Sequence, residues 1–199
     1  MSILTRLMAP AILALFSSCA KICSVPATGV KVNDNHVAFA TSKIPCNKTK
    51  DYEDAVKGAI VVIYSGEFET RLGDHIKNHI GTGPHAKAWE NLDAGNIAAN
   101  MRRQLHGQYV ETYGGIKGWW LYTFYHNIAY DGTMHGPIKL NRIPLRKRDA
   151  ASIANTIAHE TAHRIGLGHP HSSSSLPIAY KEPPYIIGKL VEDLFKKTK

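Results

Sequence analysis

Residues 159–169 read His-Glu-Thr-Ala-His-Arg-Ile-Gly-Leu-Gly-His, with three histidines and one glutamate at fixed spacings. A helix advances about 100° per residue, so His159 and His163 lie about 40° apart on one face, one turn apart along the axis. Both imidazoles can therefore bind one ion. Glu160 projects about 60° from His163, within reach of a water molecule beside that ion. The string predicts a metal site with a general base next to it.

The third histidine requires the helix to end first. If the helix continued past His163, His169 would lie roughly 9 Å further along the axis, out of reach of the same ion. Gly166 supplies the turn because glycine enters the left-handed conformation without a Cβ clash, and Gly168 adds further freedom. We therefore expect the helix to end near Gly166 and the chain to fold back.

The residues before the string support a helix that is buried on one side. Asp149 stands at the expected N-cap position. Apolar and small residues cluster on the face opposite the two histidines: Ile153, Ala154, Ile157, Ala158, Thr161 and Ile165.

The eleven-residue string resembles the signature HExxHxxGxxH of the metzincin clan of zinc-dependent endopeptidases, and all five fixed positions match. The resemblance implies that His159, His163 and His169 bind Zn²⁺ and that Glu160 acts as general base and acid. It implies a shallow cleft that binds a protein or peptide substrate in extended form. It also implies an α+β, zincin-like fold, with a small mixed sheet, an active-site helix and a C-terminal helix.

The chain departs from the metzincin pattern downstream of the third histidine. Metzincins have a turn containing methionine beneath the zinc, whereas the last methionine here is Met134. Two segments are candidates for the turn: 176–180, with Tyr180 near the zinc, and 183–188, with Tyr185, which resembles a proline-tyrosine segment of small bacterial metzincin-like proteins. The second is favoured. Either tyrosine is a candidate to stabilise the developing oxyanion.

Periodicity and propensity predict the remaining elements. Helices are expected over 51–64, 67–79, 94–105 and 185–197, with a buried strand over 59–63 as the alternative within the first; strands are expected over 119–125 and 137–141. In metzincins the strand before the active-site helix borders the cleft and pairs with the substrate. Residues 138–141 are therefore our candidate for β-addition, with a plain core strand as the alternative.

The N-terminus has the features of an export signal, assigned to residues 1–19. Arg6 precedes an apolar run, residues 7–16, that Pro10 interrupts and that is too short to span a bilayer. Residues 16–19 resemble a bacterial lipobox, in which Cys19 would be acylated; the alternative is signal-peptidase cleavage after residue 20 or 27. We expect an exported protein, either a cell-envelope lipoprotein or a secreted protein.

Cysteine parity suggests a disulfide bond. If Cys19 carries lipid, Cys23 and Cys46 remain as an even pair in an oxidising compartment. Residues 28–50 show no periodic pattern, and residues 20–50 are expected to be a tether or an extended entry segment, with the metzincin-like domain over 51–199.

Length, charge and composition indicate which kinds of binding partner to expect. The 199 residues suit one domain, and the net charge of +8 comes from scattered basic residues without a nucleic-acid-binding motif. We expect a monomer that meets a membrane only through an N-terminal lipid. The expected function is a zinc-dependent endopeptidase. The alternative is a non-hydrolytic zinc-binding envelope lipoprotein that uses the same scaffold for partner binding.

Overall fold

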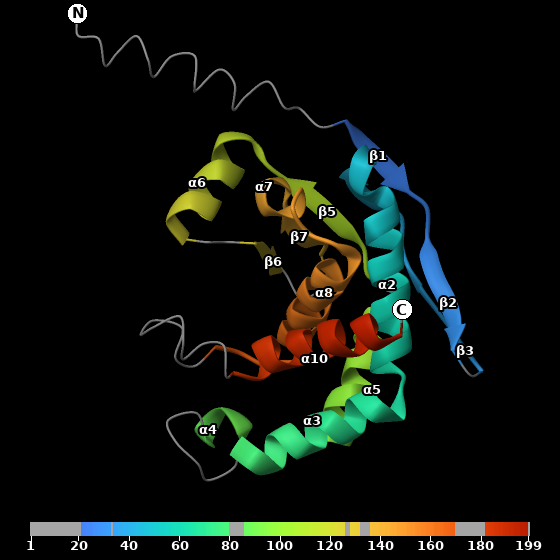
Figure 1. The fold of residues 1–199 in the computed structure, drawn as a ribbon, viewed down its shortest axis with the longest axis vertical. Helices are drawn as coiled ribbons and strands as arrows, with labels where there is room; N and C mark the ends of the chain where they lie inside the picture. Colours follow the sequence, from blue (N-terminus) through green and yellow to red (C-terminus); the bar gives the residue numbers. More distant parts are fainter. Residues whose placement is uncertain are drawn as a thin grey trace, which may run out of the picture.

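The computed structural model describes residues 21–32, 34–79, 86–125, 128–131, 136–169 and 182–198. They form a mixed α+β fold with one five-stranded sheet, as the sequence predicts at this level (Figure 1). The strands are β1 Ile22–Val25, β2 Thr28–Val32, β3 Asn35–Phe39, β4 Ser42–Pro45, β5 Val110–Tyr113, β6 Ala129–Asp131 and β7 Ile138–Asn141. The helices are η1 Cys46–Lys48, α2 Thr49–Ile63, α3 Gly66–His79, α4 Ala86–Trp89, α5 Ala94–Leu105, α6 Gly115–Tyr125, α7 Arg142–Leu145, α8 Ala150–Arg164 and α10 Pro183–Lys197.

The main sheet has the strand order β1-β4-β5-β7-β6. β4, β5 and β7 run parallel in its centre, while β1 pairs antiparallel with β4 at one edge and β6 pairs antiparallel with β7 at the other. β2 and β3 form a separate antiparallel pair, and β2 packs on α2. The central strands contribute fully buried apolar side chains to the core, among them Ile44, Val110 and Ile138.

Three helices carry most of the packing around the candidate site. α8 packs against α2 on one side and against α10 on the other (Figure 1). α10 approaches α8 closely at Gly188, where an added Cβ would lie 2.4 Å from Oδ1 of Asn155 and 2.9 Å from its carbonyl oxygen. Any larger side chain at Gly188 would force the two helices apart, so this glycine sets their separation.

The N-terminal residues differ from the sequence prediction. Residues 20–50 were expected to be a tether or an extended segment, but residues 22–45 form four strands, and β4 lies inside the main sheet. A disulfide bond joins Cys23 to Cys46 across this segment. The strands are only four or five residues long, too short for their alternation to be recognised. Their buried side chains belong to the same core as the helices: Val25, Val37, Phe39 and Ile44.

Ser42 joins three elements through one buried hydroxyl group. Its oxygen accepts a hydrogen bond from the Val110 N–H at 3.0 Å and lies 2.7 Å from Oη of Tyr52, while its own hydrogen goes to the Ala40 carbonyl. Burial raises the pKa of the Tyr52 phenol, which therefore stays a hydrogen-bond donor. This hydroxyl connects β4 to both β5 and α2.

The substitution Ser42→Ala should lower the free energy of unfolding by about 1–3 kcal/mol, because the Tyr52 hydroxyl and the Val110 N–H lose a buried acceptor. Urea denaturation measures the change. Ser24→Ala, at an exposed serine on β1, should change the stability by no more than about 0.5 kcal/mol. An equal effect of both substitutions would contradict the role given to Ser42.

The predicted helices are present. The helices predicted over 51–64, 67–79, 94–105 and 185–197 correspond to α2, α3, α5 and α10. The buried strand considered over 59–63 is wrong, because these residues end α2.

One of the two predicted strands is wrong, and for the other the structure supports the plain core strand that was the alternative to β-addition. Residues 119–125 were expected to form a strand but belong to α6. Aromatic residues favour strands only where a neighbouring strand packs against them, and here Gly115 turns the chain with a φ of +67° at the start of a helix. Residues 138–141 do form a strand, β7, but it lies between β5 and β6 and is not an edge. Among the described residues the edge strand beside α8 is β6.

Candidate metal centre

α8 carries His159, Glu160 and His163, as predicted. Asp149 caps its N-terminus, where Oδ1 accepts a hydrogen bond from the Ser152 N–H at 2.8 Å. The opposite face of the helix is almost completely buried: Ile153, Ala154, Ile157 and Ala158. The burial of this face fixes the rotation of α8 and so the direction in which the histidines project.

Gly166 ends α8 as predicted, with a φ of +90°. The Gly166 N–H bonds to the carbonyl of His163 at 3.0 Å, and the Leu167 N–H bonds to the carbonyl of Ala162 at 3.2 Å. These two bonds form a Schellman motif, in which a left-handed residue reverses the chain at a helix end. The reversal brings His169 back beside the other two histidines.

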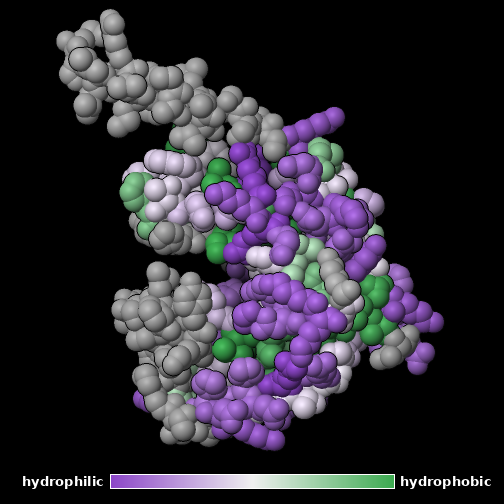
Figure 2. Space-filling view, viewed as in Figure 1, coloured by the Kyte–Doolittle hydropathy of each residue, from purple (hydrophilic) through white to green (hydrophobic). Residues whose placement is uncertain are grey.

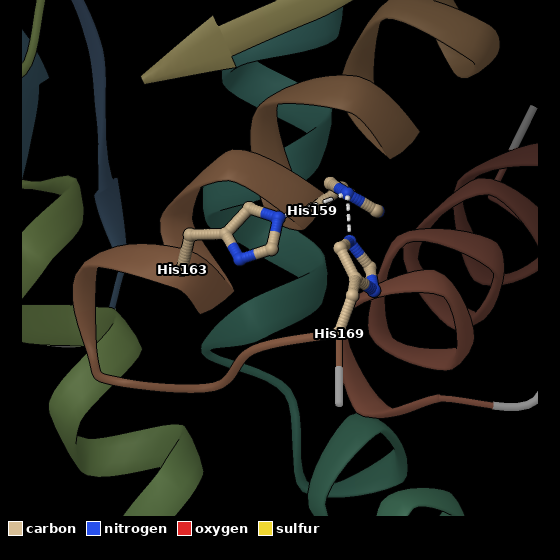
Figure 3. A group of neighbouring side chains, drawn as sticks. All are labelled: His159, His163 and His169. Atoms are coloured by element: carbon tan, nitrogen blue, oxygen red, sulfur yellow. Dashed lines mark hydrogen bonds between the residues drawn. The ribbon is translucent and has the colours of Figure 1, made fainter. Parts of the chain in front are cut away.

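The three imidazoles converge through their Nε2 atoms (Figure 3). Nε2 of His159 lies 3.2 Å from Nε2 of His163 and 3.2 Å from Nε2 of His169. Three nitrogens bound to one tetrahedral zinc ion at about 2.0–2.1 Å would be about 3.3 Å apart. Within the described part of the chain, no other group of three or more metal-ligating side chains lies close enough to share an ion.

Backbone carbonyls hold two of the three rings. Nδ1 of His163 lies 2.8 Å from the carbonyl oxygen of Leu167, in the turn that Gly166 creates. The ring of His159 forms a hydrogen bond with the backbone of Pro184 at the start of α10. Because proline has no backbone N–H, the imidazole is the donor.

A buried carboxylate holds the third ring. Nδ1 of His169 lies 2.8 Å from Oε2 of Glu182, whose side chain is fully buried. Glu182 is the N-cap residue of α10, yet its side chain makes no capping hydrogen bond. The first two helical residues are Pro183 and Pro184, which have no N–H to offer. This acidic side chain is thus directed to a histidine rather than to its own helix.

These contacts determine which ring nitrogens carry hydrogen. A neutral imidazole that donates through Nδ1 presents a lone pair at Nε2, and in that form His163 and His169 direct their lone pairs toward Nε2 of His159. The pKa of His159 is lowered to about 3, chiefly by burial and secondarily by the neighbouring imidazoles of His163 and His169. This ring is therefore neutral at physiological pH. Neutral imidazoles with converging lone pairs are the form that binds metal. The three residues can therefore hold a metal ion.

Tyr185 packs against two of the three histidines. Its ring centroid lies 4.6 Å from that of His159 and 4.7 Å from that of His169. Of the two segments proposed for the missing methionine turn, the structure thus brings residues 183–188 to the histidines. The segment 176–180, with Tyr180, lies outside the described residues.

Glu160 is 6% exposed and lies next to the first histidine of the cluster. Its charge contributes to raising the pKa of Tyr113 to about 12, after the larger effects of burial and of Tyr130. The Tyr113 and Tyr130 rings, on β5 and β6, meet edge to face with centroids 5.2 Å apart. The charge of Glu160 thus acts on the phenol of Tyr113, the last residue of β5.

Sequence reasoning did not identify Glu182 or Tyr113 as site residues. Glu182 precedes two prolines and a tyrosine, a pattern that indicates a helix start but not a contact 13 residues back along the chain. Tyr113 ends β5, 47 positions before Glu160, so no local pattern indicates that the charge of Glu160 acts on its phenol. Cys19, the predicted lipidation site, lies outside the described residues.

Comparisons with known proteins return no match: no family model, no curated protein and no solved structure corresponds to this chain.

The substitution Glu182→Gln should weaken Zn²⁺ binding by about 10- to 100-fold, because the amide holds the His169 imidazole without a negative charge. Competition with a chromogenic chelator measures the affinity. Glu192→Gln, on the same helix and bonded to Asn155 and Lys196, is the matched control and should leave the affinity unchanged. Equal affinities for the wild type and the Glu182 variant would show that this carboxylate does not support the site.

Proposed function

We propose that the protein is a zinc-dependent endopeptidase that hydrolyses peptide bonds in extended protein or peptide substrates. One observation carries the proposal. Nε2 of His159 lies 3.2 Å from Nε2 of His163 and of His169, and the carboxyl group of Glu160 follows His159 on the same helix. Three nitrogen ligands beside a carboxyl group that is not itself a ligand are typical of hydrolytic rather than structural zinc sites.

The donor set suits zinc. Imidazole is a ligand for zinc, copper, iron and nickel, and hard cations such as magnesium and calcium prefer oxygen. Three protein ligands leave a fourth position of a tetrahedral ion open to water or substrate. When bound, zinc supplies Lewis acidity, which makes water a nucleophile near neutral pH and stabilises negative charge on a carbonyl oxygen.

Glu160 moves the proton in this proposal. Its carboxylate accepts the proton that the water loses as the water oxygen bonds to the carbonyl carbon. It then donates that proton to the amide nitrogen as the C–N bond breaks. Burial of the side chain to 6% exposure keeps bulk water away and strengthens its interaction with the developing charges.

The edge of the sheet supports an extended substrate. β6 is the outermost described strand at one edge of the main sheet, pairs antiparallel with β7 and contacts α8. Its outer edge can accept main-chain hydrogen bonds from a peptide in extended conformation. The role first given to residues 138–141 thus passes to β6, because β7 is paired on both sides.

The substitution Glu160→Gln should lower kcat for peptide cleavage by at least about 100-fold while Zn²⁺ stays bound, because the amide cannot take the proton. A peptide-library digest, with the zinc content measured in parallel, tests this. Glu90→Gln, at an exposed glutamate, is the control and should cleave like the wild type. Equal cleavage by the Glu160 variant would refute the proposed base. A wild type that binds zinc but cleaves no peptide would instead support the non-hydrolytic alternative.

Tyr185 is proposed to support the ligand rings through its own ring. Tyr185→Phe keeps that ring and should retain Zn²⁺ affinity, whereas Tyr185→Ala should weaken it by about tenfold or more. Chelator competition measures both variants. If Tyr185→Phe lowers kcat while its zinc affinity is unchanged, the phenol stabilises the oxyanion and the supporting role is wrong.

A further inference from the structure

α6 exposes a surface that its sequence would normally bury. Among the described residues, seven large hydrophobic side chains are exposed, and five of them lie on α6: Ile116, Trp119, Trp120, Tyr122 and Phe124. A helix that is apolar on all sides is usually enclosed by other protein or by lipid. The described part of the chain provides no such enclosure for α6.

α6 is held to the body of the protein by contacts with α7, by Lys117, whose Nζ lies 5.9 Å from the centroid of the Tyr130 ring, and by contacts at Gly118. The Asn141 side chain donates a hydrogen bond to the Gly118 carbonyl at 2.8 Å, and an added Cβ on Gly118 would lie 3.0 Å from the Asn141 side-chain oxygen. Gly118 is buried, whereas the aromatic residues around it face outward. Pale and green atoms therefore gather over α6 in Figure 2, while purple dominates the remainder of that face.

The composition of α6 is typical of a helix at a membrane surface. Tryptophan and tyrosine concentrate where hydrocarbon meets water, and α6 carries Lys117 and no acidic residue. Its 11 residues span about 16 Å, about half of a bilayer core. No described helix is long and apolar enough to cross a membrane. Any contact of α6 with lipid would therefore lie along the surface.

The start of the described chain lies at the same end of the molecule. The long axis is vertical in Figure 1, and both α6 and the start of β1 lie toward its upper end. Only residues 20 and 21 separate Cys19 from Ile22, so an extended chain covers about 10 Å between them. A membrane attachment at Cys19 or in the apolar run before it would hold this end of the protein against the bilayer. Ile22 is itself exposed, at 40%.

We propose that α6, together with Ile22, docks on the surface of a lipid bilayer that contains anionic lipids. Arg146 and Lys147 are exposed just after α7, the helix that packs against α6. With Lys117 they place positive charge beside the aromatic rings, and each basic residue near an anionic surface contributes about 1 kcal/mol. The proposal concerns orientation and does not depend on peptidase activity.

The three tryptophans of the chain provide the test, because Trp119 and Trp120 are on α6 and Trp89 is fully buried. The full chain is mixed with vesicles of phosphatidylcholine and phosphatidylglycerol in which the acyl chains are brominated, since bromine quenches tryptophan that enters the bilayer. We expect loss of emission and protection from an aqueous quencher. The double variant W119F/W120F, with emission only from Trp89, should show no quenching by brominated lipid.

A second control measures quenching of a tryptophan placed away from α6, near the end of α2. Val61 is exposed at 43% near the end of α2, about 18 Å along the helix from its first residue. V61W in the W119F/W120F background should stay unquenched, and unchanged Zn²⁺ affinity of each variant shows that it is folded. Wild-type protein that binds the vesicles without quenching, or does not bind them, would overturn the proposal. Equal quenching at Val61 and on α6 would also overturn it.

Discussion

The candidate site depends on one constraint: three neutral imidazoles must direct their Nε2 lone pairs to a single point. Each ring can meet it by donating its one N–H to an oxygen atom of the protein. The Leu167 carbonyl comes from the turn after α8, while the Pro184 carbonyl and the Glu182 carboxylate come from the start of α10. Two of the three contacts therefore disappear if α10 separates from α8.

The body of the fold holds these two helices in place. α8 is buried against α2, and α10 approaches α8 closely at Gly188, where no side chain larger than hydrogen fits. Further away, the Ser42 hydroxyl joins β4, β5 and α2, and the disulfide bond of Cys23 closes the N-terminal strands onto the same core. Side chains with no contact to the histidines thus contribute to the geometry of the site.

α6 differs from the rest of the described molecule in exposing its large apolar side chains. Elsewhere apolar side chains are mostly buried, but on α6 the large ones face outward. Their exposure costs free energy in water. A bilayer would remove that cost without any change in the helix. The same aromatic residues misled the prediction of a strand, because strand propensity measures how well a side chain packs against neighbours that α6 does not have.

The sequence alone determined the local features of this protein. The spacing of His159, His163 and His169, the cap at Asp149 and the turn at Gly166 follow from helix geometry and backbone sterics, which act within a few residues. Tertiary structure decided the contacts between distant segments. Glu182 reaches His169, β6 rather than β7 forms the edge, and residues 22–45 join the core. Strand order and helix docking arise from packing over the whole chain, and short strands leave no periodic pattern from which that packing can be read.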